Sequence, residues 1–368
     1  MSEIILAINP GSTSTKIALY DGEKLSFESD IHHTNSELKA FDKVVDQFFY
    51  RKDAIAKEIE NHGVNLTDID IIVGRGGLTY PIASGTYLVN EAMKNDLRCS
   101  PIGEHASNLG GLIAQEMAHE ISQKKGVTVE AYVTDPVVVD EMQEVARLTG
   151  HPLFERKSIF HALNQKAVAR RYVASRGERY EDMNLIITHL GGGITVAAHA
   201  HGRAIDTSNA LDGDGPFTPE RTGILPLVDV VKMCYSGKYT AEQMQRMIKG
   251  EGGFVAHLGT NNTQEVLKRI KNGDQKAALV LDALCYNVAK YIGAMATVLR
   301  GRVDAIIITG GMAHSPEVVQ QIASRVEFIA PVAVYAGQDE MNALAVSGLG
   351  VLRGTVTPKI YAPVHVEK

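Results

Sequence analysis

Cysteine is scarce in this chain of 368 residues: Cys99, Cys234 and Cys285 lie far apart and form no CxxC pair. Such spacing indicates neither a zinc site nor a disulfide framework. No apolar run approaches the ~20 residues that a membrane-spanning helix needs. The N-terminus enters a strand-like segment with no basic or apolar leader. We therefore expect buried free thiols and a cytoplasmic protein.

An excess of positive charge is also missing. Charged residues make up 22% of the chain, and its formal net charge is -6 at pH 7. A mildly acidic chain lacks the electrostatic attraction that draws proteins to nucleic acid or to an anionic membrane. We expect neither partner, so an anionic substrate must be held by a local basic site. The hydrophobic share of 45% suffices for a large core, and the length favours two domains.

Two common nucleotide-binding signatures are absent from the sequence. No segment matches GxxxxGK[ST], and no GxGxxG opens a helix, so neither a P-loop nor a dinucleotide fold is expected. Instead, four apolar strands end in Gly-rich turns, at residues 9–16, 74–77, 189–193 and 309–312. Glycine lets backbone N–H groups approach an anion closely, and hydroxyls or a lysine add donors. The first and third turns lead into another strand, which indicates hairpins that hold phosphate.

Helical periodicity alternates with short β-branched runs, which indicates the α/β class. The expected strands are 4–8, 17–20, 69–73, 185–188, 195–200 and 305–308. The expected helices are 41–60, 108–124, 158–174, 240–248, 263–271, 275–299, 315–324 and 341–352.

The first hairpin has a counterpart near the middle of the chain. Aligning Gly11 with Gly191 also superposes Gly22 on Gly202 without a gap. Matched hairpins half a chain apart suggest a duplicated domain. Because Gly-rich hairpins are common, spacing alone leaves this question open.

In order along nearly the whole chain, the motifs resemble those of the acetate kinase family. Residues 9–16, Asn-Pro-Gly-Ser-Thr-Ser-Thr-Lys, are similar to the first phosphate motif of that family, and Pro10 and Thr13 are similar to its butyrate kinase branch. The other similar segments are 74–77, His105, 133–135, 158–161, 189–193, 206–208, 220–223, 309–312 and 339–340.

This resemblance implies a fold, which is that of the superfamily of acetate and sugar kinases, heat-shock chaperones and actin. We expect duplicated actin-like (ribonuclease H-like) α/β domains with mixed sheets and a nucleotide cleft between them. The expected boundaries are 1–157 and 158–337, with a C-terminal helix at about 338–356 that packs back on the first domain. We also expect a homo-oligomer, at least a dimer.

The resemblance also implies a reaction: reversible, in-line phosphoryl transfer from ATP, with Mg²⁺, to the carboxylate of a short-chain fatty acid. Butyrate is the favoured acid, while acetate, propionate and isobutyrate stay open. A nucleotide-gated binding module, like actin or the chaperone ATPases, is a remote alternative. A carboxylate has no proton to lose at pH 7, so the enzyme must chiefly bring two anions together and stabilise the transferring group.

Catalytic roles are expected by resemblance for Arg75, Arg221, His161 and Asp135. The arginines would meet the carboxylate and the transferring phosphoryl, and His161 would hydrogen-bond that phosphoryl. Asp135 and Glu340 would organise Mg²⁺, which prefers few carboxylates together with phosphates and waters. Local roles stay open: ion pairs for the arginines, with Glu220 beside Arg221, a structural role for His161 and a turn cap for Asp135.

Nucleotide-binding roles are likewise expected by resemblance. The expected residues are Asn9, Ser12, Ser14, Lys16, His189, Gly191, Gly192 and Gly193, with Gly310 and Gly311 against the adenosine. Residues 312–314, Met-Ala-His, replace the Ile-Gly-Glu of acetate kinases, which leaves the nucleobase contacts open. Residues 212–215, Asp-Gly-Asp-Gly, lack the later ligands of an EF-hand and predict a turn.

Overall fold

The computed structural model describes residues 3–211 and 213–363. They form two compact units. Unit 1 comprises the described residues up to Val139 and those from Asp339 onward, and unit 2 comprises Asp140–Gln338.

The first boundary lies earlier in the chain than residue 157, where we expected it. Residues 140–157 belong to unit 2 because their polar side chains bind there. Arg156 donates to the carboxylates of Asp206 at 2.9 Å and Asp214 at 3.2 Å. Glu141 accepts from the backbone N–H of Ala204 at 2.9 Å. The contact with Asp214 also accounts for one acid of segment 212–215, whose first residue lies outside the described residues.

The sheet of unit 1 has seven strands in the order β12-β5-β6-β4-β1-β2-β3. Its strands are β1 (Ile4–Pro10), β2 (Ser14–Asp21), β3 (Lys24–His32), β4 (Ile71–Arg75), β5 (Thr86–Leu88), β6 (Glu130–Thr134) and β12 (Lys359–Ile360). The first three strands are antiparallel neighbours, whereas β4 runs parallel to β1 and β6 runs parallel to β4.

The sheet of unit 2 repeats this pattern in the order β11-β10-β7-β8-β9. Its strands are β7 (Asn184–Leu190), β8 (Ile194–Ala200), β9 (Arg203–Thr207), β10 (Ala305–Gly310) and β11 (Val332–Ala336). Again three antiparallel strands are followed by two parallel ones. Gly22 and Gly202, which the sequence alignment matched, both have positive φ, 57° and 73°, between the second and third strands.

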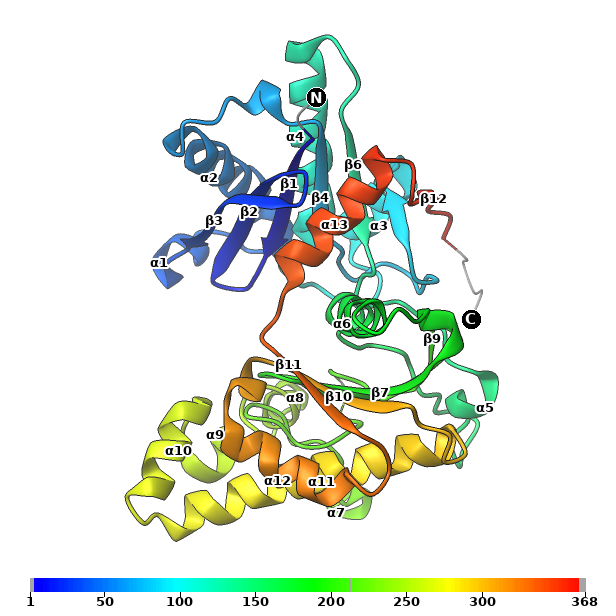
Figure 1. Ribbon diagram of the computed structural model, residues 1–368. Coiled ribbons are helices and arrows are strands. Elements are labelled where there is room, and N and C mark those ends of the chain that lie inside the picture. The colour runs from blue at the N-terminus through cyan, green and yellow to red at the C-terminus, as the bar shows by residue number, and fades with distance from the viewer. Residues whose placement is uncertain (1–2, 212, 364–368) are drawn as a thin grey trace. The chain divides into compact units, whose positions relative to one another are not determined.

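Helices cover both faces of each sheet. In unit 2, Leu185 and Ile187 share a buried cluster with residues of α6 (Ala162–Ala174), while Ile186 shares one with residues of α11 (Gln275–Val298) and α12 (Pro316–Val326). Figure 1 shows α6 on one side of this sheet and α11 and α12 on the other. In unit 1, α2 (Phe48–Asn61) and α4 (Asn108–Lys125) cover one face, and α13 (Glu340–Leu352) packs on β1 and β4. Alternate side chains on each strand therefore enter different layers of the core.

The remaining helices are short. They are α1 (Asn35–Leu38), α3 (Glu91–Cys99), α5 (Glu144–Arg147), α7 (Leu227–Cys234), α8 (Ala241–Ile248), α9 (Gly253–Leu258) and α10 (Thr263–Lys271). The expected helices at 41–60 and 158–174 begin later, at Phe48 and Ala162. A 3₁₀ turn, Val44–Gln47, precedes the first of them. Strand β3 was not predicted because it is mostly exposed and carries polar residues on both faces.

Helix α11 is long and apolar enough to span a membrane by length and composition alone. This is weak evidence, because the core helix of a soluble protein passes the same test. Val280, Leu284, Val288 and Ile292 of α11 belong to the core of unit 2. The helix is therefore apolar because it lies against the sheet.

The expectation of buried thiols is right for one cysteine and wrong for two. Cys285 on α11 is buried, and burial raises the pKa of its thiol to about 12. Cys99 and Cys234 are exposed, since each ends a surface helix.

The glycines at 74–77 allow the end of β4 to touch the first turn of α4. A Cβ atom on Gly74 would lie 2.4 Å from the carbonyl oxygen of Gly110. Conversely, a Cβ atom on Gly110 would lie 2.2 Å from the carbonyl oxygen of Arg75. These glycines thus have a packing role, which places Arg75 at the edge of the sheet.

We expect Gly110→Ala to lower the free energy of unfolding by about 3 kcal/mol, because the new methyl group would overlap backbone atoms that cannot yield. Gly293→Ala on α11 is the matched control, since no atom lies within 4 Å of the added Cβ. It should be neutral or stabilising by up to about 1 kcal/mol. Urea unfolding monitored by circular dichroism measures both, and equal midpoints for the two variants would refute the packing argument.

Candidate active site

Three predicted site residues of unit 1 meet through one carboxylate oxygen. Oε2 of Glu340 accepts from Nδ2 of Asn9 at 2.7 Å and from Nη1 of Arg75 at 3.0 Å. Nη1 of Arg75 also donates to Oδ1 of Asn9 at 3.2 Å. Asn9 lies one residue before the end of β1, Arg75 ends its parallel neighbour β4, and Glu340 begins α13. Arg75 does form an ion pair, but with a buried site residue: its side chain keeps 22% of its surface exposed, against 6% for Glu340.

The loop at residues 9–16 is a tight hairpin turn. The N–H of Gly11 donates to the carbonyl of Ser14 at 2.7 Å. Ser12 and Lys16 are exposed and Ser14 is half-buried, so these predicted phosphate ligands are accessible to a ligand. Side chains alternate between the two faces of a strand, and the neighbours of Lys16 on β2, Thr15 and Ile17, are buried. Lys16 therefore faces outward.

A residue that the sequence reasoning missed, Arg51 on α2, holds this loop from inside. It is fully buried. Its guanidinium donates to the carbonyls of Gly11 at 2.8 Å, Ser12 at 3.1 Å and Ser14 at 3.1 Å. Arg51 occupies the buried face of α2, four residues before Ile55. The sequence did contain a signal for Arg51, because it is a charged residue at a helix position that otherwise carries apolar residues.

His33 lies buried beside the same loop. Its Nε2 is 2.9 Å from Oγ1 of Thr15, and its Nδ1 is 3.2 Å from the hydroxyl of Tyr50. Burial, and secondarily the charge of Arg51, lower the pKa of His33 to about 4. The histidine is therefore neutral near pH 7, and the positive charge under the loop belongs to Arg51.

Asp135 follows β6 in an unusual backbone conformation, with φ of 40°. Its Oδ1 accepts from Oγ of Ser84 at 2.5 Å and from the N–H of Gly85 at 2.8 Å. The carboxylate thus orders a turn, and the residue lies in a sparsely populated region that is often retained at functional sites. Among the described residues, no three His, Cys, Asp or Glu side chains form a metal-binding group. Mg²⁺ prefers few carboxylates together with phosphate oxygens and water, and the carboxylates of Asp135 and Glu340 are ligands of that type.

The predicted loop of unit 2, at residues 189–193, packs against a turn at 218–221. The N–H of Gly191 donates to the carbonyl of Gly193 at 3.1 Å, and Oγ1 of Thr218 donates to the carbonyl of Gly192 at 2.6 Å. A Cβ atom on Gly193 would lie 2.4 Å from Nη1 of Arg221. Glycine at this position therefore leaves room for the guanidinium beside the loop.

Arg221 contacts the backbone of a neighbouring loop. Its Nη1 donates to the carbonyl of Ala210. The neighbouring Glu220 accepts from Nδ2 of Asn261 at 2.7 Å.

The two predicted histidines of unit 2 stack on each other. The ring centroids of His161 and His189 are 3.8 Å apart, and the ring planes differ by 10°. Nδ1 of His161 lies 2.8 Å from Oγ1 of Thr195, and Nδ1 of His189 lies 2.8 Å from Oδ1 of Asn164. Unit 2 thus brings His161, His189, the three glycines and Arg221 to one edge of its sheet.

The loop at 309–312 lies next to the end of β7. Gly310 has φ of 92°, and a Cβ atom on it would lie 2.3 Å from the carbonyl oxygen of Leu190. Its N–H donates to the carbonyl of Gly337 at 3.0 Å. Gly311 then begins a 3₁₀ turn, Gly311–His314. Glycine is thus required at 310 by close packing, and the adenosine contact stays a prediction.

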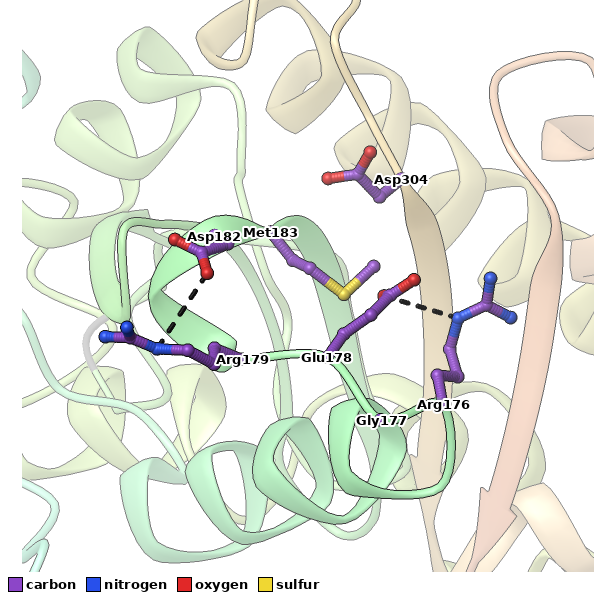
Figure 2. A pocket seen from close by; sticks show the side chains of 7 residues that line it. All are labelled: Arg176, Gly177, Glu178, Arg179, Asp182, Met183 and Asp304. Carbon is purple, nitrogen blue, oxygen red and sulfur yellow. Dashed lines mark hydrogen bonds and ion pairs between the residues drawn. The ribbon is translucent and has the colours of Figure 1, made fainter.

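A cavity of about 450 Å³ lies at the opposite end of the same sheet, before β7 and β10 begin (Figure 2). Its lining residues are Arg176, Gly177, Glu178, Arg179, Asp182, Met183 and Asp304. The arginines are paired with acids: Arg176 with Glu178 at 3.4 Å, and Arg179 with Asp182 at 3.8 Å. This cavity contains none of the predicted site residues, and its three acids outnumber its two arginines, so it offers an anion no net positive charge.

Comparison with known proteins settles the family. The model of the acetokinase family matches residues 146–349, which is more than half of the chain. The chain belongs to the acetokinase family. It is 50% identical to butyrate kinase 1 of Clostridium acetobutylicum over 97% of this chain and 99% of that protein. It is also 48% identical to a probable butyrate kinase of Clostridium botulinum, over 98% of this chain and all of the relative.

Solved structures agree on the fold. Acetate kinase of Porphyromonas gingivalis superposes with a TM-score of 0.76 at 18% identity, covering 95% of this chain and all of that one. The family and the duplicated actin-like fold predicted from the motifs are thus confirmed. Membership implies a nucleotide and a small carboxylate as substrates, with the divalent metal usual for kinases.

The pKa of His33 predicts a pH dependence of stability. Unfolded His33 takes up a proton near pH 6.5, whereas the folded residue does so only near pH 4. Stability is therefore lost as pH falls below 6.5, by about 2 kcal/mol between pH 7 and pH 5. Urea unfolding at both pH values measures the loss, with His33→Gln as the control because glutamine does not titrate. An equal loss in wild type and variant would show that His33 is not the cause.

Proposed function

We propose that this chain is an ATP-dependent butyrate kinase, which transfers the γ-phosphoryl group of ATP directly and reversibly to the carboxylate of butyrate. The products are butyryl phosphate and ADP. The observation that carries the proposal is the 48–50% identity, over nearly the full length, to proteins named as butyrate kinases. The arrangement of cations, imidazoles and glycine loops at the ends of the strands supports it.

The cationic residues supply what the chemistry needs. Two anions must approach each other in a chain with net charge -6, and the carboxylate itself needs no base. Arg75, fixed by Glu340 and Asn9, meets the substrate carboxylate and the incoming phosphoryl. Arg221, held beside Gly193, offsets the charge that develops in the transition state. His161 donates a hydrogen bond to the transferring group.

The glycine loops bind the nucleotide. Asn9, Ser12, Ser14 and Lys16 serve the phosphates from unit 1. His189 and the glycines 191–193 serve them from unit 2, and Gly310 and Gly311 lie against the adenosine. The cleft between the two copies stays a prediction.

Asp135 and Glu340 would hold Mg²⁺, together with phosphate oxygens and water. Two carboxylates suit Mg²⁺, because it keeps several waters and phosphate ligands. Asp135 is supported by its buried carboxylate in a constrained turn. When bound, the ion neutralises phosphate charge.

Association of the chain with itself is supported by α7. None of the residues of this helix is buried, although several are apolar: Leu227 and Val228 are 79% and 68% exposed. Apolar surface of this kind commonly lies in an interface between subunits. We infer a homo-oligomer, at least a dimer, which light scattering on the purified chain can test. ATP as substrate favours the cytoplasm as its location.

Substitution of either arginine tests the proposed chemistry. Arg75→Ala and Arg221→Ala should each lower kcat by at least about 10²-fold, since arginines that stabilise a transferring phosphoryl contribute 10³–10⁵-fold elsewhere. Arg179→Ala is the matched control, because this arginine lies in the cavity of Figure 2 and its side chain is 74% exposed. A folded Arg75 or Arg221 variant with near-wild-type turnover would remove that residue from the mechanism.

A series of acids tests the substrate. Butyrate should exceed acetate in kcat/KM by roughly fifteen-fold, because burying two more methylenes contributes about 1.6 kcal/mol. Ile159, Phe160 and Leu163 are apolar residues available beside His161. Acyl phosphate is trapped with hydroxylamine across acetate to hexanoate and isobutyrate, at saturating Mg-ATP. If acetate or isobutyrate gives the highest kcat/KM, the butyrate assignment is wrong and that acid takes its place.

A further inference from the structure

A continuous series of hydrogen bonds runs behind His161 through the interior of unit 2. The hydroxyl of Tyr180 lies 2.5 Å from Nδ1 of His199, and Nε2 of His199 lies 2.9 Å from Oε1 of Gln165. Nε2 of Gln165 lies 2.9 Å from Oγ1 of Thr195, which is 2.8 Å from Nδ1 of His161. The first four residues are at most 5% exposed, so water cannot replace these bonds at little cost.

The amide of Gln165 sets the direction of the series. Its Nε2 also lies 3.3 Å from the backbone carbonyl of Thr195. A carbonyl oxygen only accepts, so the amide nitrogen must point toward Thr195. The amide oxygen then faces His199 and requires a proton on Nε2 of that ring.

His199 is neutral, which decides its other nitrogen. Burial, and secondarily the charges of Lys166 and Arg170, hold the pKa of His199 well below its usual range. A neutral ring with its proton on Nε2 has a lone pair on Nδ1, so the hydroxyl of Tyr180 donates to it. Lys166 itself is paired with Glu141 at 2.7 Å.

The hydroxyl of Thr195 continues the same donor-to-acceptor direction to His161. Its oxygen already accepts from Gln165, and the other contact found among the described residues is Nδ1 of His161. If that nitrogen bore a proton, the hydroxyl hydrogen of a fully buried residue would lack an acceptor. The hydroxyl therefore donates to Nδ1 of His161, and all four bonds run the same way, which strengthens each of them.

We propose that Thr195, Gln165, His199 and Tyr180 are positioning residues that hold His161 as the neutral imidazole with its proton on Nε2. The inference rests on the proposed function for its catalytic meaning, because a proton on Nε2 can be donated to an oxygen of the transferring phosphoryl. The opposite tautomer would turn a lone pair toward that anion. The parallel stacking of His161 on His189 fits the same state, since two charged rings 3.8 Å apart would repel each other.

The tautomer is measured directly by ¹⁵N NMR of the full-length chain with labelled histidine, which distinguishes protonated from unprotonated ring nitrogens. His161→Gln identifies the signals of His161. We expect a protonated Nε2 and an unprotonated Nδ1 in the wild type at pH 7. A protonated Nδ1 overturns the proposal whatever the activity of the enzyme.

Two substitutions interrupt the series at different points. Thr195→Val removes the hydroxyl while keeping the shape of the side chain. Gln165→Met removes the amide donor, and its thioether sulfur offers the Thr195 hydroxyl hydrogen a weak alternative acceptor. In both variants His161 should populate both tautomers, and kcat should fall at least about tenfold with little change in KM. Thr195→Ser keeps the hydroxyl and should restore the wild-type spectrum and most of the activity.

The outcomes separate this inference from the proposed function. An unchanged His161 spectrum in folded Thr195→Val, or full activity in Gln165→Met, means that the series does not set the tautomer. A wild-type chain that forms no acyl phosphate from any acid rejects the proposed function instead, while its NMR spectrum still tests the tautomer.

Discussion

Positive charge has to be kept available to a phosphate in a chain whose net charge is negative, and this constraint governs the site. Arg51 shows one solution. Its buried guanidinium binds Gln47, Thr15 and the carbonyls of the loop, with no carboxylate among its contacts in the described residues. Carbonyl dipoles compensate for burial without cancelling the charge. The loop at 9–16 therefore presents the side chains of Ser12 and Ser14 above a fixed positive charge.

Arg75 shows a second solution, in which its carboxylate partner, Glu340, is shared with Asn9. Glu340 accepts from both Arg75 and Asn9 with a single oxygen, so the pair holds the arginine in place and joins α13 to the ends of β1 and β4. The chain returns to unit 1 at Asp339, and α13 packs there closely: a Cβ atom on Gly348 would lie 2.8 Å from Val73. Packing of this helix and placement of the arginine are therefore coupled.

The two units share a sheet pattern but support their loops differently. In unit 1 the support is a buried arginine, whereas in unit 2 it is a series of neutral side chains ending at two stacked imidazoles. A neutral imidazole can donate without adding charge, and its direction depends on the partner of its other nitrogen. The loop of unit 1 is thus supported by a fixed positive charge, and the imidazoles of unit 2 by neutral hydrogen-bonding groups.

The sequence by itself determined the family and the α/β class, and it supplied the predictions of site residues, because strand-ending glycine turns and their order along the chain are local features. It also indicated the duplication through Gly22 and Gly202, since a left-handed turn favours glycine wherever it occurs. Only the tertiary structure decided that Glu340 pairs with Arg75 across 265 residues, and that Arg51 and His199 lie behind the loops. Such residues are polar groups at core positions, and their partners come from distant strands and helices. Local periodicity reports burial, but it carries no information about which distant atoms will satisfy a buried hydrogen bond.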